Sequence, residues 1–290
     1  MNAWILAARP KTLPAAVVPV WVGSMPLLTD GDQATGSWLL FWSTLVSCLC
    51  IQIATNLFND AIDFAKGADT AKRLGPKRAT ASGLLSRRSV MLGAMGFCLL
   101  AVIIAVPLLV ERGWPIAVIG MVSLFFAYGY TGGPFPLAYR GMGELFVILF
   151  FGFVAVLGSY YVQAGVLGGR SIWILGLQCG LYSSVLIAIN NLRDRGEDKG
   201  TGKRTMAVRF GSRFARIEIA IFCLVPSFLY PILGEGDQRA FTALFLSLPL
   251  AIIISLLIFK TKPGPAYNKY LALGALQLLL FGALAVLAIA

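Results

Sequence analysis

WLLFWSTLVSCLCIQIATNLF, residues 38–58, contains no charged residue and runs directly into the polar stretch Asn59-Asp60-Ala61-Ile62-Asp63. A helix needs roughly 20 apolar residues to cross the ~30 Å hydrocarbon layer of a membrane. The run has this length, and the acids follow it at one end. It therefore predicts a transmembrane helix with carboxylates at a membrane surface.

Eight other apolar runs accompany this one. The nine lie near residues 12–28, 38–58, 89–110, 113–131, 142–163, 171–192, 215–234, 240–259 and 268–290. The 290 residues are 58% hydrophobic and only 13% charged, whereas soluble domains are about 25% charged. We therefore expect an all-α, polytopic protein of the lipid bilayer, with nine transmembrane helices in one domain over residues 1–290. The first run is broken by prolines, which favours a mature helix over a cleaved signal.

The net charge of +11 is gathered in particular loops. With a cytoplasmic N-terminus, the inner segments carry 21 of the 24 Lys and Arg residues, and the outer loops carry only Arg112, Arg170 and Arg239. The positive-inside rule explains this bias without a nucleic-acid partner. The charges therefore predict a bacterial-type inner (plasma) membrane protein with its N-terminus and polar loops in the cytoplasm.

The residue types also limit the chemistry. All five cysteines fall inside predicted spans, where Cys behaves as a small apolar residue. The chain has no histidine, which excludes the commonest general base and zinc ligand. A catalytic site in this chain would have to rely on carboxylates and cations.

Two polar inner loops, about 59–88 and 193–216, resemble one another. Each begins where a span ends, with Asn and Asp at helical spacing, followed by glycines and a basic cluster. This similarity indicates a duplication of four spans, with a ninth span added. We expect the bundle to be built from two four-helix repeats plus one helix, with the two loops covering its inner end.

The acids of the two loops repeat one geometry. Asn59 and Asp63 are four residues apart on a continued helix, as are Asn190, Asp194 and Asp198. Carboxylates at this spacing repel unless a cation lies between them, and Mg²⁺ typically binds one or two carboxylates together with substrate phosphate oxygens. The predicted metal ligands are Asp60, Asp63, Asp69, Asp194 and Asp198, and the predicted catalytic residues are Asp60, Asp63, Asp194 and Asp198.

Cationic and amide side chains near the acids suit the remaining phosphate oxygens. The predicted diphosphate-binding residues are Asn59, Asn190, Lys66, Arg73, Arg78, Lys203 and Arg204. No nucleotide-binding loop is present, so the substrate should be a lipid diphosphate. The alternative interpretation is that these acids only cap helix ends and pair with neighbouring Lys and Arg.

These motifs resemble those of the UbiA superfamily of intramembrane aromatic prenyltransferases, over essentially the whole chain. In that superfamily the patterns seen at Asn59–Asp63 and Asp194–Asp198 bind magnesium diphosphate. The superfamily usually has a further acid four residues after Asp63, where this chain has Gly67; the next acid is Asp69. The resemblance implies Mg²⁺ as cofactor and a polyprenyl diphosphate as substrate.

Longer stretches resemble the 1,4-dihydroxy-2-naphthoate branch: Arg9–Pro14, Gly67–Arg78, Tyr130–Tyr139 with Gly141–Glu144, and Gly202–Thr205. That branch transfers a polyprenyl group to the naphthoate with loss of CO₂ and diphosphate, giving demethylmenaquinone for menaquinone biosynthesis. The candidate acceptor-binding residues are Lys11, Tyr130 and Arg140, and the aromatic residues expected to shield an allylic cation are Phe58, Tyr128, Tyr130, Tyr160 and Tyr161.

Two other functions remain open. A related prenyltransferase could use another acceptor, such as 4-hydroxybenzoate. A secondary transporter could also combine an internal repeat with broken helices, although a carrier places its polar site near the membrane midplane. The acids of this chain lie at the inner ends of spans instead.

Overall fold

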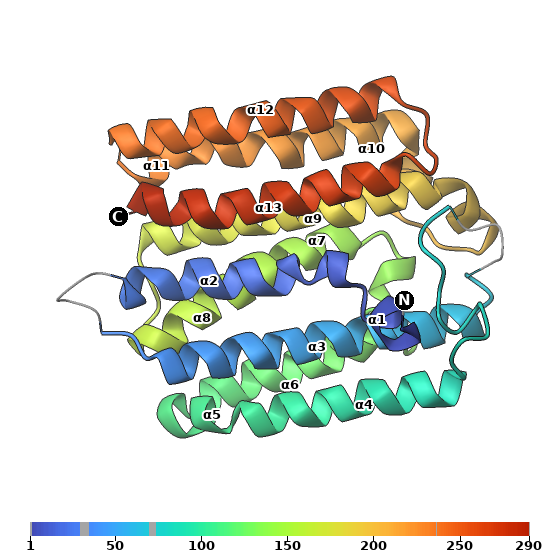
Figure 1. Cartoon of the computed structure of the whole chain (residues 1–290), viewed down its shortest axis with the longest axis horizontal. Helices are drawn as coiled ribbons and strands as arrows, with labels where there is room; N and C mark the ends of the chain where they lie inside the picture. The colour runs from blue at the N-terminus through green and yellow to red at the C-terminus, as the bar shows by residue number, and fades with distance from the viewer. Residues whose placement is uncertain (1, 30–34, 70–73, 236, 290) are drawn as a thin grey trace.

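The computed structural model describes residues 2–29, 35–69, 74–235 and 237–289, and these ranges contain helices and no strand. The helices run side by side along one direction (Figure 1). Seven helical segments in the described ranges are long and apolar enough to cross a membrane. They are α3 (Trp38–Ala65), α4 (Arg87–Ile104), α7 to α8 (Gly143–Ala164), α9 (Arg170–Gly200), α10 to α11 (Met206–Leu233), α12 (Gln238–Lys260) and α13 (Tyr267–Ile289).

The remaining helices are shorter or bent. The segment formed by α1 (Ala3–Ala8) and η1 (Pro10–Thr12) meets α2 (Pro14–Leu28) at an angle of 47°, and this pair makes an eighth span if it is counted as one. Helix α6 (Trp114–Gly129) has 16 residues, and α5 (Val106–Arg112) has seven. The prediction of an all-helical, multi-span protein is confirmed. By length and composition, the described helices give seven spans, or eight with the bent pair, so the predicted count of nine is not confirmed.

Local sequence sets the helix ends. The hydroxyls of Ser37, Ser86 and Thr205 accept backbone amides in the first turns of α3, α4 and α10, which satisfies donors that the helix itself leaves open. The bend between α1 and α2 begins at Arg9, which has a φ of 53°, followed by Pro10. Proline has no amide hydrogen and cannot continue the preceding helix.

Both acidic clusters lie on helices. Helix α3 continues through Asn59 and Asp63 to Ala65, and α9 continues through Asp198 to Gly200. The inner loops predicted at 59–88 and 193–216 are therefore shorter than expected. Five residues, 201–205, separate the end of α9 at Gly200 from the start of α10 (Met206–Leu224). Continued helices pair the backbone groups that a loop would leave open.

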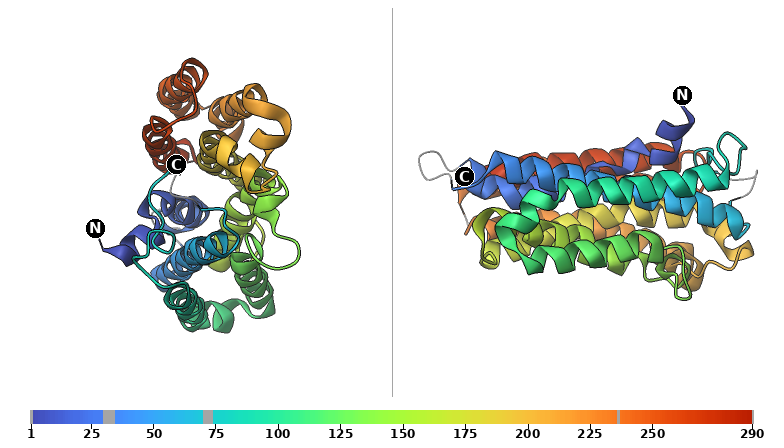
Figure 2. Two further views of the ribbon diagram at one scale, coloured as in Figure 1. Left: turned by 90° about the vertical axis from the view of Figure 1, so that its right-hand side faces the viewer. Right: turned by 90° about the horizontal axis from the view of Figure 1, so that it is seen from below.

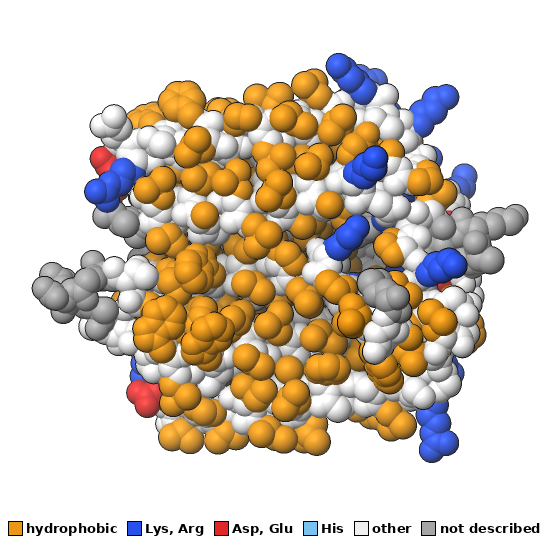
Figure 3. All heavy atoms as spheres, in the orientation of Figure 1, with side chains coloured by type: hydrophobic (Ala, Val, Ile, Leu, Met, Phe, Trp, Pro, Cys, Tyr) orange, Lys and Arg blue, Asp and Glu red, His pale blue; other side chains and the backbone are white. Residues whose placement is uncertain are grey.

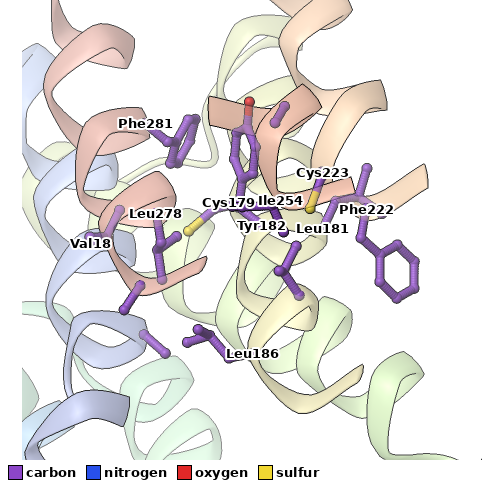
Figure 4. Close-up of a cluster of buried hydrophobic side chains, with 14 of the residues drawn as sticks. Val18, Cys179, Leu181, Tyr182, Leu186, Phe222, Cys223, Ile254, Leu278 and Phe281 are labelled. Atoms are coloured by element: carbon purple, nitrogen blue, oxygen red, sulfur yellow. The ribbon is translucent and has the colours of Figure 1, made fainter. Parts of the chain in front are cut away.

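The main hydrophobic core lies between α9, α10, α12 and α13. Helix α9 is the most buried span, with 78% of its most apolar window inside the protein. Figure 4 shows Tyr182, Ile254 and Phe281 meeting in this core. The Tyr182 hydroxyl is satisfied by a 3.0 Å hydrogen bond with the Ser227 hydroxyl. These four helices form one packed half of the bundle, and the other half lies against it.

The outer surface matches a membrane environment. Hydrophobic side chains cover the face seen in Figure 3, and Lys and Arg gather toward the end at which α3 and α9 finish. Figure 2 shows the same bundle end-on and from below. Large apolar side chains such as Val110, Trp114 and Phe125 are exposed. On a soluble protein, exposed apolar side chains of this kind would favour aggregation.

Candidate active site

One cavity of about 840 Å³ begins where α3 and α9 end and continues between the helices. Its mouth is lined by Asn59 and Asp63 from α3 and by Asn190, Asp194 and Asp198 from α9. The two acidic clusters, which are far apart in the sequence, therefore face the same space. Both are at the end of the bundle rich in Lys and Arg (Figure 3).

Asp63 is the centre of a polar network at the mouth. Its Oδ1 accepts a 2.8 Å hydrogen bond from the Tyr139 hydroxyl, and its Oδ2 accepts a 2.9 Å bond from Nζ of Lys203. The ammonium groups of Lys66 and Lys203 lie 4.3 and 5.0 Å from the centre of the Tyr139 ring. A carboxylate of α3 thus holds a cation from the segment that follows α9.

Burial and neighbouring charges shift the pKa values of two members of this network, Tyr139 and Lys66. Burial raises the pKa of Tyr139, and the negative charge of Asp63 raises it further, so the phenol stays protonated and donates. Burial lowers the pKa of Lys66, whose ammonium group donates a 2.7 Å bond to the carbonyl of Thr131. The hydroxyl of Thr131 in turn donates to Oδ1 of Asn59. Hydrogen bonds therefore connect the turn after α6 to the first acidic cluster.

Asp60 and Asp69 have other contacts. The two carboxylate oxygens of Asp60, which is 1% exposed, accept the backbone amides of Ala79 and Thr80 at 3.1 and 3.0 Å. Asp69 forms an ion pair with Arg78, with 3.3 Å between Oδ2 and Nε. Neither acid lines the cavity. Their predicted metal roles would require that these contacts rearrange, because the oxygens are turned to the loop after α3.

A chain of hydrogen bonds connects the second acidic cluster, on α9, to the loop that follows α3. Arg193 donates two 2.7 Å hydrogen bonds to Asp194, one to each carboxylate oxygen, and a third 2.7 Å bond to Oδ1 of Asn268. Asn268, near the start of α13, donates a 3.1 Å bond to the carbonyl of Leu74. Asp198 lies buried one turn beyond Asp194 and also lines the cavity.

The other predicted binding residues are placed unevenly. Lys203, Arg78, Lys11 and Tyr130 line the cavity, whereas Arg204 is exposed and does not. Arg140 is exposed as well and stacks on Phe135, with 3.5 Å from its guanidinium carbon to the ring centre. Arg73 lies outside the described residues. The structure thus brings most of the predicted cations to the mouth but not Arg140 or Arg204.

An aromatic cluster forms the wall just inside the mouth. The rings of Phe146 and Phe150 stack at 4.1 Å, and those of Phe126 and Tyr130 lie 5.2 and 5.4 Å from Phe146. All four line the cavity. Of the aromatic residues predicted from the sequence, only Tyr130 is among them; the others, Phe58, Tyr128, Tyr160 and Tyr161, do not line it. Which aromatic residues face the cavity depends on how the neighbouring helices pack, and this cannot be predicted from one helix alone.

Several further polar residues line the cavity that were not among the predicted site residues. Arg9, Lys77, Glu144, Asn191 and Arg193 line the cavity. Glu144 carried a physical signal, because an acid inside an apolar run is functional by default in a membrane protein. Arg9 and Lys77 lie in the stretches that resemble the naphthoate branch, whereas Asn191 and Arg193 look like ordinary residues of a polar loop.

The donor atoms at the mouth suit a magnesium ion. They are carboxylate and amide oxygens, and no Cys or His sulfur or nitrogen is present among the lining residues at this end. Within the described part of the chain no three acidic, Cys or His side chains lie close enough to hold a metal by themselves. Mg²⁺ does not need such a group, since it binds one or two carboxylates and completes its shell with phosphate oxygens and water.

Known proteins share this architecture. The UbiA prenyltransferase family matches residues 16–276. The 1,4-dihydroxy-2-naphthoate octaprenyltransferase of Bacillus subtilis (strain 168) is 36% identical over 207 residues, which is 71% of this chain and 65%, just under two thirds, of that protein. The protein of the same name from Escherichia coli (strain K12) is 34% identical over 221 residues, 74% of this chain and 70% of that protein.

The fold is also known from a solved structure. A UbiA homolog from Archaeoglobus fulgidus bound to GPP and Mg²⁺ superimposes with a TM-score of 0.71 and covers 99% of each chain. Its sequence is 16% identical, so this likeness concerns the fold alone.

Proposed function

Because the chain belongs to the UbiA prenyltransferase family, we propose that it is a Mg²⁺-dependent enzyme that transfers a polyprenyl group from polyprenyl diphosphate to 1,4-dihydroxy-2-naphthoate. The reaction releases CO₂ and diphosphate and gives demethylmenaquinone, a step of menaquinone biosynthesis. One observation carries the proposal: a single cavity has both acidic clusters at its mouth and apolar walls behind them. The similarity to naphthoate prenyltransferases supports the choice of acceptor.

The mouth would hold the diphosphate. Asp63, Asp194 and Asp198 are the proposed ligands of Mg²⁺, which when bound stabilises negative charge on the leaving diphosphate. Lys203 and Arg78 line the cavity and would donate to diphosphate oxygens, as would the amide groups of Asn59 and Asn190 and the ammonium group of Lys66 beside them. Asp60 and Asp69 remain candidates that would first have to leave the contacts they make now.

The cavity behind the mouth would hold the prenyl chain. It is lined by apolar side chains of α3 to α6 and of α8 (Ala155–Ala164), among them Ile51, Leu108, Ile116 and Val162. The aromatic cluster stands between this apolar part and the acids, where the bond to diphosphate would break. Aromatic faces there would stabilise the positive charge that develops on the allylic carbon and exclude water from it.

The acceptor would enter beside the aromatic cluster. Lys11 and Tyr130 both line the cavity near its mouth and are the proposed acceptor-binding residues. An ammonium group suits the acceptor's carboxylate, and the phenol of Tyr130 suits a ring hydroxyl. Arg140, also predicted for this role, would have to leave its stacking on Phe135 to reach the ligand.

The same placement supports a topology. We propose nine spans in two repeats of four plus one, counting the bent pair of α1 and α2 and the shorter α6 as spans. The chain would then form one transmembrane domain over residues 1–290 in a bacterial-type inner membrane. The end with the acids and most Lys and Arg would face the cytoplasm, together with the N-terminus, as the positive-inside rule requires.

The decisive experiment measures product in membranes that contain the protein. Geranylgeranyl diphosphate would be supplied with Mg²⁺ and either 1,4-dihydroxy-2-naphthoate or 4-hydroxybenzoate, and products identified by mass. We expect prenylated, decarboxylated naphthoquinol, and none with EDTA or in Asp194→Asn. Product from the benzoate alone would contradict the acceptor, and no Mg²⁺-dependent product from either would contradict the enzyme. A variant of an outer-end residue, Arg239→Gln, is the matched control and should be fully active.

A further inference from the structure

A buried carboxylate lies in the cavity wall apart from both aspartate clusters. Glu144 is in the first turn of α7 (Gly143–Val147), is 4% exposed and lines the cavity. Its Oε1 accepts a 2.7 Å hydrogen bond from Nδ2 of Asn191, whereas its Oε2 is buried with no hydrogen-bond partner among the residues that the structure describes. Burying an unsatisfied carboxylate oxygen is costly. The open oxygen is therefore well placed to bond to a ligand.

Glu144 lies close to residues of the diphosphate end, the aromatic cluster and the proposed acceptor site. Its partner Asn191 follows Asn190 on α9, one turn before the second acidic cluster, and Phe146 of the aromatic cluster is two residues further along α7. The Tyr130 hydroxyl is also near, because a Cβ placed on Gly143 would lie 2.9 Å from it. The carboxylate thus stands between the diphosphate end and the aromatic wall, beside the proposed acceptor site.

We propose that Glu144 is a catalytic base that takes the proton of the acceptor's ring hydroxyl at Oε2; this inference rests on the proposed function. The ring carbon bearing the carboxylate, next to the hydroxyl carbon, bonds to the allylic carbon, and the allylic C–O electron pair leaves with diphosphate. The hydroxyl proton passes to Glu144, and the hydroxyl oxygen becomes a ketone.

The second half of the reaction returns the proton. The bond from the ring to the carboxylate breaks and releases CO₂, and its electron pair restores the aromatic ring. The ketone oxygen recovers its proton from Glu144. The carboxylate is regenerated, and no net proton is taken up or released. A base that takes one proton and returns it within the same reaction needs no proton path to water, which fits a buried carboxylate.

Among the described residues, two titratable groups interact electrostatically with Glu144: Tyr130, after α6, and Glu218 on α10. Glu218 is 9% exposed and does not line the cavity. It is therefore a matched control, since it is a second buried carboxylate in a membrane-spanning helix but cannot touch the acceptor.

The test compares Glu144→Gln, Glu144→Asp and Glu218→Gln in the full chain, reconstituted with Mg²⁺, geranylgeranyl diphosphate and 1,4-dihydroxy-2-naphthoate. Single-turnover product is measured by mass, and binding of a non-reactive geranylgeranyl diphosphate analogue is measured separately. In Glu144→Gln we expect binding within about threefold of wild type but transfer about 100-fold slower. Its rate should rise about tenfold per pH unit as the acceptor hydroxyl ionises by itself, unlike wild type. Glu144→Asp should recover part of the rate, and Glu218→Gln should match wild type.

Three results would overturn the inference. They are a wild-type transfer rate in Glu144→Gln, a loss of transfer matched by an equal loss of analogue binding, and a slow variant whose pH dependence parallels that of wild type. The last two would give Glu144 a structural role. A wild-type protein that makes no prenylated naphthoate would instead defeat the proposed function, and is recognised before any variant is compared.

Discussion

Asp63→Asn changes a side chain that joins α3 to Tyr139 and Lys203. In the structure, Asp63 accepts a 2.8 Å bond from the Tyr139 hydroxyl and a 2.9 Å bond from the Lys203 ammonium. Asparagine is nearly isosteric and still offers an oxygen to Tyr139, but it has no charge for Lys203. The substitution therefore removes the ion pair and leaves the packing in place.

The effect on stability follows from burial. The side chains of Asp63 and Lys203 are 5% and 13% exposed. Breaking a fully buried pair costs about 3–5 kcal/mol, but Lys203 is on a short segment after α9 and can turn toward water. We therefore expect the free energy of unfolding to fall by only about 1–2 kcal/mol, the range of a hydrogen bond to a charged group.

The effect on catalysis should be larger. Removing one preorganised group that stabilises transition-state charge typically lowers the rate about 10²–10³-fold. A stability loss of about 1–2 kcal/mol leaves a protein of ordinary stability folded. The lost activity would therefore report on the site and not on folding.

The assay pairs thermal unfolding in detergent with Mg²⁺-dependent prenyl transfer at saturating substrate. Lys203→Met and the double variant complete a double-mutant cycle, in which we expect a stability coupling of about 1 kcal/mol between Asp63 and Lys203. Asp63→Asn with more than about a tenth of wild-type transfer would refute its role as a metal ligand, given the expected loss. A coupling of zero would refute the ion pair.

Three further predictions concern the cation at the mouth, the apolar wall and the helix packing. Burial lowers the pKa of Lys66, so its ammonium group should lose its proton, and the protein its diphosphate affinity, as pH rises. Lys66→Arg, which stays protonated, should keep its diphosphate affinity to higher pH in a titration of pyrophosphate binding. Gly158 lines the cavity, and a Cβ there would meet only Ile119 Cδ1 at 3.9 Å; Gly158→Leu should slow transfer from geranylgeranyl diphosphate about tenfold, or about 1.4 kcal/mol, and spare dimethylallyl diphosphate. A Cβ on Gly152 would lie 2.5 Å from the Gly176 carbonyl oxygen; Gly152→Ala should lower unfolding free energy by about 1–3 kcal/mol, with Gly158→Ala as the unaffected control.

Much of the fold could be predicted from individual segments of the sequence. Each helix that crosses the bundle coincides with an apolar run, because the length and composition of a run are properties of one segment. The number of spans was harder, since the break at Arg9 and Pro10 and the short α6 leave the count dependent on how each is classed. The sequence also left the ends of α3 and α9 imprecise, because polar residues that continue a helix resemble the start of a loop.

The candidate site divides in the same way. Asp63, Asp194 and Asp198 were predicted from helical spacing and do line the cavity. Asp60 belongs to the same motif, yet its oxygens hold the amides of Ala79 and Thr80. The spacing within a helix shows which acids share a face, but not which neighbouring segment will occupy their oxygens.

The sequence by itself determined that this is a helical membrane protein, that its acids lie at helix ends, and that cations surround them, because hydropathy, periodicity and charge are carried by each segment alone. Only the tertiary structure decided that the two acidic clusters share one cavity and that Phe146 and Phe150 form part of its wall. It also decided that Glu144 faces this cavity with one oxygen that has no hydrogen-bond partner in the described part of the chain. These features depend on contacts between helices remote in the chain, and such contacts follow from the packing of the whole bundle.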